Sequence, residues 1–294
     1  MTALDVPVAA VPTATSPTAR RRRSRRRAIR PGVALAAVFL VLLVVAALVP
    51  EWLAPQDPLA LSPDGAFLPP GPGHLLGTDQ TGRDVLSRII HGARPTLILG
   101  LGATALAVTG GTLLGLLAGI GGRFVEGTLM RLVDVALAVP DLLLALVVIT
   151  LVGTGTSNVL FAVAFASVPY YARIVRAQVH VVRRATYVEA ATTLGLSRSA
   201  VIARHVLPNA LKPLVVLATI RIGDAIANGA SLSFLGLGTP PPAAEWGSML
   251  STGIQYISND WFMLAVPGLA ITLTVLAVTV VGRDLRRRSE GRAS

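Results

Sequence analysis

The chain has 294 residues, of which 53% are hydrophobic and only 14% charged, and its mean hydropathy is +0.67. A soluble domain carries about 25% charged residues, so this composition excludes an ordinary soluble protein and indicates a surface that largely faces lipid. The absence of cysteine excludes a disulfide framework and cysteine-ligated zinc, and four scattered histidines predict no metal site. The net charge of +11 gathers beside apolar runs, which is typical of the cytoplasmic flanks of membrane helices. The alternative is an anionic-lipid or nucleic-acid site, but no nucleic-acid module is present and we predict no nucleic-acid partner.

Composition divides the chain into four parts. Residues 1–29 are rich in Ala, Pro, Thr, Ser and Arg without periodicity, and we predict a disordered basic cytoplasmic tail. Residues 30–93 should hold the first transmembrane helix, retained rather than cleaved as a signal peptide, and an external amphipathic segment. Residues 94–283 should form the main transmembrane domain, and residues 284–294 a cytoplasmic tail.

Apolar runs predict about six transmembrane helices. They lie at 33–49, 95–119, 132–152, 159–174, 211–230 and 262–281, and the fourth is the weakest because it is short and contains Pro169. With both termini cytoplasmic, 22 of the 26 Lys and Arg residues fall on the inner side and three (Arg83, Arg88 and Arg94) on the outer side. This bias predicts a multi-pass protein of a prokaryotic plasma membrane in that orientation.

The segment from Gly77 to Gly92 has the pattern of a short amphipathic helix. Val85, Leu86, Ile89 and Ile90 would share one face, and the pairs Asp79/Arg83 and Asp84/Arg88 have i,i+4 spacing on the other. Such a helix would end at Gly92 and lie on the outer membrane surface, or it would pack on its own protein.

Two features within the spans suggest close packing and function. Gly111, Gly115 and Gly119 recur every four residues, a strip that lets another helix approach, either in this chain or in a partner. Asp141 is costly in hydrocarbon and is a candidate for the translocation path; the structural alternative is that it faces the bundle interior. For Asp134 we expect a position at the cytoplasmic interface near Arg131.

The cytoplasmic segment TYVEAATTLGLSRSAVIARHVLPN, residues 186–209, is too polar to span a membrane. Thr186 and Glu189 have the spacing of a capping box that starts a helix. Gly195 fits a helix stop that needs positive φ, and Ser197 can cap a second helix that runs to Pro208 and leads into the fifth span. This pattern predicts a rigid helix–corner–helix element, with an ordinary surface helix pair as the alternative.

In this segment Glu189, Ala190 and Ala191, followed by Gly195 and by Leu207 and Pro208, resemble the EAA loop of permeases of ATP-binding-cassette (ABC) importers. The chain resembles specifically the dipeptide, oligopeptide and nickel permease family, in its second (DppC/OppC-type) subunit. The resemblance covers residues 33–282 and rests on HLLGTDQTGRDVLSRIIHGAR (74–94), PYYARIVRAQV (169–179), YVEAATTLG (187–195), RHVLPN (204–209) and SLSFLGLGTPPPAAEWGSML (231–250).

The resemblance implies an all-α, type I ABC importer permease fold. It gives the six EAA-loop residues the role of coupling to an ATPase subunit. It also implies the partners: a second homologous permease, two ABC ATPases and an extracytoplasmic solute-binding protein, together with membrane lipids. The chain has no Walker A pattern, so ATP and Mg²⁺ would be used by the partners, with no cofactor and no enzymatic activity in this chain.

The resemblance favours di- and oligopeptides as substrates, with nickel or another small solute as the alternative. A rival of another class is an ATP-independent secondary transporter or channel, which would leave the EAA loop unexplained. A membrane-embedded enzyme would need a catalytic constellation that the sequence lacks. Two departures from the family pattern stand out: Gly229 replaces the usual glutamate, and the residues after Gly282 lack the usual acidic, proline-ended close.

Overall fold

The computed structural model describes residues 31–290; the predicted tail 1–29 and the last four residues of the tail 284–294 lie outside this range. Within the described residues the chain is helical, with two isolated bridges and no β-strand. The helices are α1 (Pro31–Leu48), α2 (Pro50–Leu53), η1 (Pro63–Gly65), α3 (Val85–Ile120), α4 (Arg123–Leu137), α5 (Asp141–Val152), α6 (Thr156–Arg183), α7 (Thr186–Thr193), α8 (Arg198–Val201), the π-helical turn η2 (Ile202–Val206), α9 (Leu207–Phe234), α10 (Trp246–Gln255) and α11 (Phe262–Glu290).

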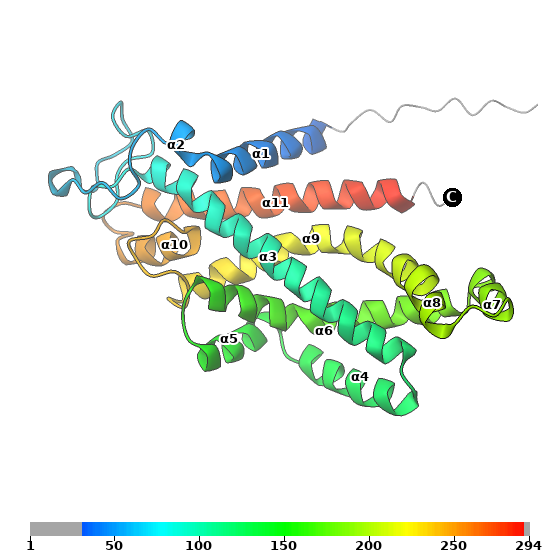
Figure 1. Ribbon diagram of the computed structural model, residues 1–294. Coiled ribbons are helices and arrows are strands. Elements are labelled where there is room, and N and C mark those ends of the chain that lie inside the picture. Colours follow the sequence, from blue (N-terminus) through cyan, green and yellow to red (C-terminus); the bar gives the residue numbers. More distant parts are fainter. Residues whose placement is uncertain (1–30, 291–294) are drawn as a thin grey trace, which may run out of the picture.

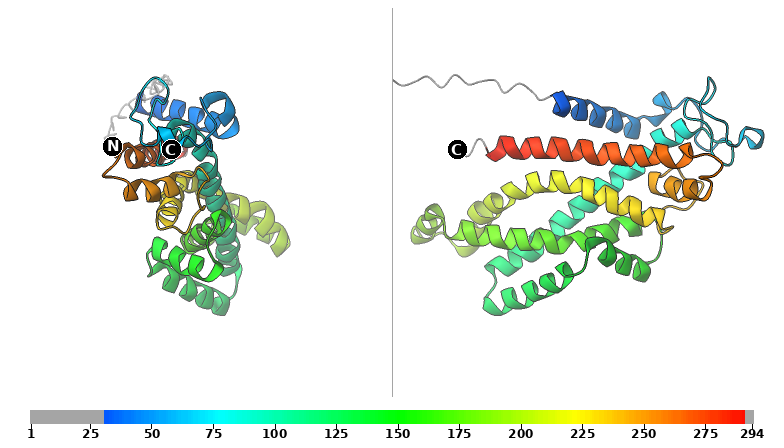
Figure 2. Two further views of the ribbon diagram at one scale, coloured as in Figure 1. Left: turned by 90° about the vertical axis from the view of Figure 1, so that its left-hand side faces the viewer. Right: turned by 180° about the vertical axis from the view of Figure 1, so that it is seen from behind.

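The long helices lie side by side in one bundle with two distinct ends (Figure 1). Residues 54–84 and α10 gather at one end, which we call the α10 end. α7 and α8 project from the other, the α7 end, where α1 also begins and α11 ends (Figures 1 and 2). α3 packs most extensively against α6, and α9 packs between α3, α6 and α11. The fold therefore places the predicted coupling loop at the end where α1 begins and α11 finishes.

Four helices are long and apolar enough to cross a membrane: α1, α3, α6 and α11. α4 and α5 make a fifth candidate if the bent pair counts as one span. α9 covers the predicted fifth span and is 28 residues long, but it carries Arg221 and Asp224 in its middle and is not among these candidates. The expectation of about six spans thus compares with four to five that qualify by length and composition within residues 31–290.

The predicted third span, 132–152, is wrong as a single straight helix. α4 ends at Leu137, α5 begins at Asp141, and the two are bent by 98°. Pro140 stands at the break, where it cannot donate a backbone hydrogen bond and disfavours helical geometry in the residue before it. The weak fourth span is, in contrast, the middle of the 28-residue α6, which continues through Pro169.

The predicted amphipathic helix at 77–92 does not form as a separate element. α3 starts at Val85 and continues through Gly92 and Pro95 for 36 residues. The preceding residues, 54–84, fold into a compact cap without long helices, which we call the α10-end cap. Gly92 does not end a helix; a Cβ there would lie 2.5 Å from the indole of Trp246, so its small size serves close packing.

The glycines of α3 lie against α6. A Cβ on Gly111 would lie 2.4 Å from Cβ of Tyr171, and one on Gly115 would lie 2.5 Å from the carbonyl oxygen of Ala172. A Cβ on Gly119 would lie 2.7 Å from Cγ1 of Val179. The strip therefore lies inside this chain, where it lets two backbones approach.

Candidate coupling site

The segment between α6 and α9 forms a hook at the α7 end of the bundle. α7 is a helix of eight residues whose Val188 and Ala191 are buried. Val188 packs in one cluster with Val201 of α8 and Val206 of η2. Glu189 and Ala190 point outward and are exposed. The hook, residues 185–206, which we call the α7–α8 segment, is thus held from inside and bare outside.

The start of α7 corrects the predicted capping box. Thr186 is the first helical residue, and the N-cap is Ala185, which has no side chain to accept a bond. The backbone N–H of Glu189 donates to the carbonyl of Ala185, and among the described residues its carboxylate has no hydrogen-bond partner. The T-x-x-E spacing therefore marks the helix start one residue too late. Glu189 is left with its place in the first turn, near the positive end of the helix dipole.

The glycine corner is confirmed. Gly195 has φ of +83°, and the N–H of Leu196 donates to the carbonyl of Ala191 at 3.2 Å, closing the end of α7. No atom lies within 4 Å of a Cβ built on Gly195, so there is space for a side chain. Glycine is favoured here by the positive φ alone. The neighbouring Leu194 is 81% exposed.

The second helix begins as predicted and ends elsewhere. Ser197 accepts a hydrogen bond from the N–H of Ala200 at 3.3 Å and caps α8. The helix does not stop at Pro208: after the π-helical turn it continues as α9 to Phe234. Leu207 is half-buried and Pro208 exposed, at the start of α9. Pro208 has no backbone N–H to donate and would leave one hydrogen bond unmade inside a regular helix. The wider π-helical turn before it accommodates this loss.

Two arginines that the sequence analysis does not single out bind the end of α3: Arg183, the last residue of α6, and Arg198 of the α7–α8 segment. Arg183 donates to the carbonyl of Gly119 and Arg198 donates to the carbonyl of Ile120, each at 2.7 Å. These carbonyls belong to the last turn of α3, where free acceptors and the negative end of the helix dipole favour cations. A cavity of about 340 Å³ lies between these arginines, with Val188, Leu196 and Ile202 in its walls. Movement of the segment would therefore pull on the end of α3.

Asp141 lies far from this segment, at the first position of α5. Its Oδ2 is 3.4 Å from Nη1 of Arg221 in α9, and its side chain is 30% exposed, so it is not enclosed in the bundle. Asp134 is paired with Arg173 of α6, and the expected neighbour Arg131 is not its partner. Helical periodicity could not find either partner, because both come from other helices.

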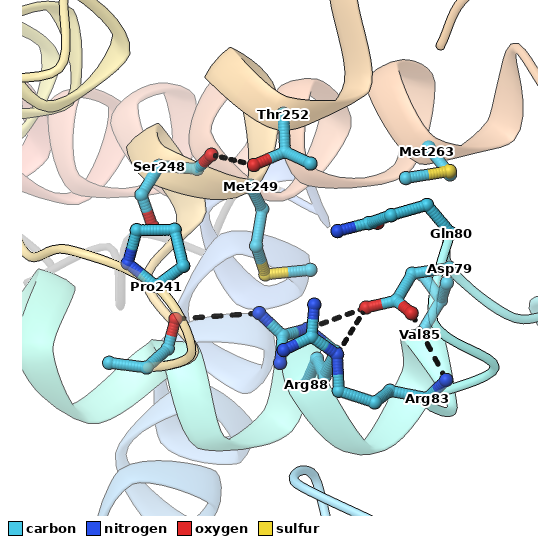
Figure 3. A pocket seen from close by; sticks show the side chains of 11 residues that line it. Asp79, Gln80, Arg83, Val85, Arg88, Pro241, Ser248, Met249, Thr252 and Met263 are labelled. Carbon is cyan, nitrogen blue, oxygen red and sulfur yellow. Dashed lines mark hydrogen bonds and ion pairs between the residues drawn. The ribbon is translucent and has the colours of Figure 1, made fainter. Parts of the chain in front are cut away.

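The α10 end holds a second polar cluster (Figure 3). Asp79 accepts from Nε of Arg83 at 2.6 Å and lies 3.6 Å from Nε of Arg88, and all three side chains are almost fully buried. Arg88 also donates to the carbonyls of Pro58 and Pro242. The predicted pair Asp79/Arg83 therefore forms, but in a buried turn and not on a helix surface.

The predicted pair Asp84/Arg88 does not form. Asp84 instead caps α3 by accepting from the N–H of Ser87 at 2.8 Å, and it contacts His74 at 3.0 Å. A cavity of about 30 Å³ remains beside Arg88 and Gln80.

The loop of residues 235–245 closes this end. Glu245 caps α10 by accepting from the N–H groups of Gly247 and Ser248, and burial raises its pKa above the ordinary value. Trp246 donates from Nε1 to the carbonyl of Ile89 at 2.9 Å. Gly229, on the neighbouring stretch of α9, is buried against Leu99: a Cβ there would lie 2.2 Å from Leu99 Cδ2. The glutamate usual in the family would require Leu99 to move.

Comparison with known families gives a consistent result. A family model described as the inner membrane component of binding-protein-dependent transport systems matches residues 111–293. The probable D,D-dipeptide transport system permease protein DdpC of Escherichia coli (strain K12) is 39% identical, with 84% of this chain and 83% of that protein covered. The di/tripeptide transport system permease protein DppC of Pseudomonas aeruginosa (strain UCBPP-PA14) is 42% identical, with 84% and 83% covered.

Solved structures agree on the fold. An inward-facing structure of the MetNI methionine ABC transporter superposes with a TM-score of 0.56 at 18% identity, covering 68% of this chain and 95% of that chain. A crystal structure of an amino acid ABC transporter with histidines gives a TM-score of 0.53 at 19% identity, with 68% and 94% covered. At these identities the likeness supports the permease fold alone.

Proposed function

The chain belongs to the family of inner membrane components of binding-protein-dependent transport systems, and we propose that it carries di- or oligopeptides across the membrane as one of two permease subunits of an ABC importer. The observation that carries the substrate is the sequence likeness, of 39% to 42% over 84% of the chain, to permeases named for dipeptides and di/tripeptides. Nickel or another small solute is the alternative that a substrate test must address.

The family places the chain in a system with a solute-binding protein and an ATPase, and we propose the finer assembly of one homologous second permease and two ATPase subunits. ATP and Mg²⁺ are used by the ATPases in this proposal. The α7–α8 segment would dock on one of them. Glu189, Ala190 and Leu194 are exposed at this end of the bundle, and this supports the proposal because their side chains are free to contact a partner. Arg198 would pass its displacement to the end of α3, which Arg183 also joins to the end of α6.

We propose that the α7 end faces the cytoplasm, with both chain termini on that side. Pro31, Glu290 and the α7–α8 segment share this end of the bundle (Figure 1). The 22-to-3 distribution of basic residues favours the same side. Reporter fusions at Ser294 and near Asp260 should give opposite answers, and fusions that report the same side would contradict this orientation.

The test of function is uptake by the reconstituted four-subunit complex with its binding protein in proteoliposomes. We expect ATP-dependent accumulation of a labelled dipeptide that requires every subunit, and no competition by Ni²⁺. Uptake by this chain alone without ATP would overturn the importer-subunit proposal and favour a secondary transporter or channel.

A further inference from the structure

One face of α6 carries a line of polar side chains from the middle of the bundle to the α7 end. Tyr170, Arg173, Arg176 and His180 follow one another at spacings of three and four residues, which places them on one side of the helix. At a rise of about 1.5 Å per residue the line is about 15 Å long. We call it the α6 stripe.

Each member of the α6 stripe meets a charged partner from another helix. Arg173 pairs with Asp134 of α4. Nε of Arg176 and Nε2 of His180 both contact Oε1 of Glu126, at 2.8 and 2.9 Å. A cleft of about 480 Å³ runs between α4 and α6 along these groups.

At Tyr170, the end of the stripe in the middle of the bundle, the stripe meets a cluster of two carboxylates and one guanidinium. The guanidinium of Arg221 lies 3.8 Å from the ring centroid of Tyr170. Its Nη1 contacts two carboxylates, Asp141 at 3.4 Å and Asp224 at 3.1 Å. One cation between two carboxylates leaves a net negative charge close to the middle of α9, a position where an unpaired charge is expensive in lipid.

A separate observation shows a polar group without a partner beside this cluster. Tyr171 is 1% exposed, and its hydroxyl has no hydrogen-bond partner among the described residues. The ring centroid of Tyr171 lies 5.5 Å from that of Tyr170, over which the guanidinium of Arg221 lies. A buried hydroxyl costs free energy unless it is satisfied, so it points to water or a ligand at this place.

The exposure of the ion pairs decides between a helix clamp and a path. Asp134 is 61% exposed and Arg173 55%, although both sit on helices of a membrane bundle. A clamp between α4 and α6 would bury its pairs, and lipid would make such exposed charges costly. Water or a polar solute beside the stripe accounts for the exposure of these charged side chains and for their position on membrane helices.

We propose that the α6 stripe and the Asp141–Arg221–Asp224 cluster line the inner half of the solute path and form a site for zwitterionic solutes. The two carboxylates would take the ammonium group and the guanidinium the carboxylate of the solute. This inference rests on the proposed function and adds the chemical class of solute that the path accepts, one with free, oppositely charged ends.

The first test is solvent access, and the chain suits it because it has no cysteine of its own. The R173C and D224C variants are assembled into the full complex in nanodiscs and treated with a negatively charged methanethiosulfonate reagent. The matched control is F165C, because Phe165 also lies on α6 and is 57% exposed, but it lies off the stripe. We expect R173C, on the stripe, and D224C, in the cluster, each to react at least about tenfold faster than the control. Equal rates, or no reaction at either position, would overturn the hydrated path.

The second test concerns charge. The D141N/D224N variant should lose at least about tenfold of its dipeptide uptake while receptor-stimulated ATPase activity persists. Modification of D224C by the negative reagent should restore uptake, and a positive reagent of similar size should not. Parallel loss of ATPase activity and uptake, or equal rescue by both reagents, would assign the cluster a structural role and overturn the site. If the wild-type complex takes up no dipeptide, the proposed function fails; if it does and the stripe stays unlabelled, this inference alone fails.

Discussion

The two ends of the bundle handle polar groups in opposite ways. At the α10 end, Asp79 and Arg83 of the cap are buried together with Arg88 of α3; Asp79 contacts both arginines, and further carbonyls accept from Arg88. In the α7–α8 segment the carboxylate of Glu189 and the side chain of Leu194 point outward without covering groups. The charged groups of the cap are paired within the chain, although Oε1 of Gln80 is buried without a hydrogen-bond partner among the described residues. The segment leaves the charged group of Glu189 exposed.

This difference indicates which end holds the chain together and which end meets another protein. A buried charge network is costly to break, since each lost partner leaves a charge without compensation. An exposed short helix costs little to alter within its own fold, so its residues can be selected for contact with a partner. Substitutions at the α10 end should therefore change stability, and substitutions at the α7 end should change coupling.

The largest expected effect on stability is that of Asp79→Ala. The change removes the carboxylate that Arg83 and Arg88 share, leaving two buried guanidinium groups without it, at a cost of about 3–5 kcal/mol. Thermal unfolding of the purified chain in detergent measures it. The control is Asp64→Ala, an exposed residue of the same cap, which should stay within about 0.5 kcal/mol. Similar melting of the two variants would contradict a cap held by its charge network.

Alanine at two glycines compares the ends directly. Gly82 and Gly195 have φ of +77° and +83°, so alanine pays about 1–2 kcal/mol of backbone strain at both. Only at Gly82 does a Cβ also clash, because it would lie 1.9 Å from the carbonyl oxygen of Ser62. We expect G82A to melt at a clearly lower temperature than G195A, because the clash lowers its free energy of unfolding by about a further 1–3 kcal/mol. A G195A variant that melts as low as G82A would show that the corner is crowded.

Much of the fold could be predicted from the sequence, because apolar length and the glycine corner are local signals. The positive φ of Gly195 is set by the local turn that ends α7, and α6 continues as one helix of 28 residues through Pro169. The break between α4 and α5 does not follow from apolar length, although Pro140, which stands at the break, is visible in the sequence. The direction of Asp141 and Asp134 could not be read either, because Arg221 and Arg173 reach them from other helices.

The α10-end cap shows the same limit more sharply. The i,i+4 spacing of Asp79 and Arg83 was right for the pair and wrong for the helix, since a tight turn also brings these side chains together. Arg183 and Arg198 were missed because their acceptors are backbone carbonyls of α3, which leave no trace in a residue pattern.

The third prediction tests coupling at the corner. Gly195→Val should leave the complex assembled but separate ATP hydrolysis from uptake, because a β-branched side chain resists positive φ and tilts α7. Gly236→Val is the control: Gly236 has the same φ of +83° and equally open surroundings, yet lies at the opposite end of the bundle. ATPase activity and uptake are measured together. Full receptor-stimulated ATPase and full uptake in G195V would end the coupling proposal.

A smaller effect is expected from the double variant R183A/R198A. It removes both donors to the last carbonyls of α3: Arg198, which links the α7–α8 segment to α3, and Arg183, which links the end of α6 to α3. Because Arg198 is exposed, water replaces much of the lost bond, and stability should fall by only about 1 kcal/mol or less. Uptake per ATP hydrolysed should fall more than melting does. Lysine at both positions can donate one bond each and should restore part of the coupling.

The smallest structural effect should come from Glu189→Ala. A capping box would have made the change cost about 1 kcal/mol, but Ala185 stands at the N-cap of α7 and the carboxylate has no hydrogen-bond partner among the described residues. Only the interaction with the helix dipole is lost, about 0.3–1 kcal/mol at an exposed site.

A loss of uptake in E189A must therefore arise from contact with another protein. We expect weaker binding of the purified ATPase to the permease pair at unchanged melting temperature, measured by titration in nanodiscs. Glu51→Ala, an exposed acid in the first turn of α2 at the α10 end, controls for charge. A drop in melting temperature as large as that of G195A would restore the capping role. Unchanged melting together with unchanged ATPase affinity would show that Glu189 does not contact the ATPase.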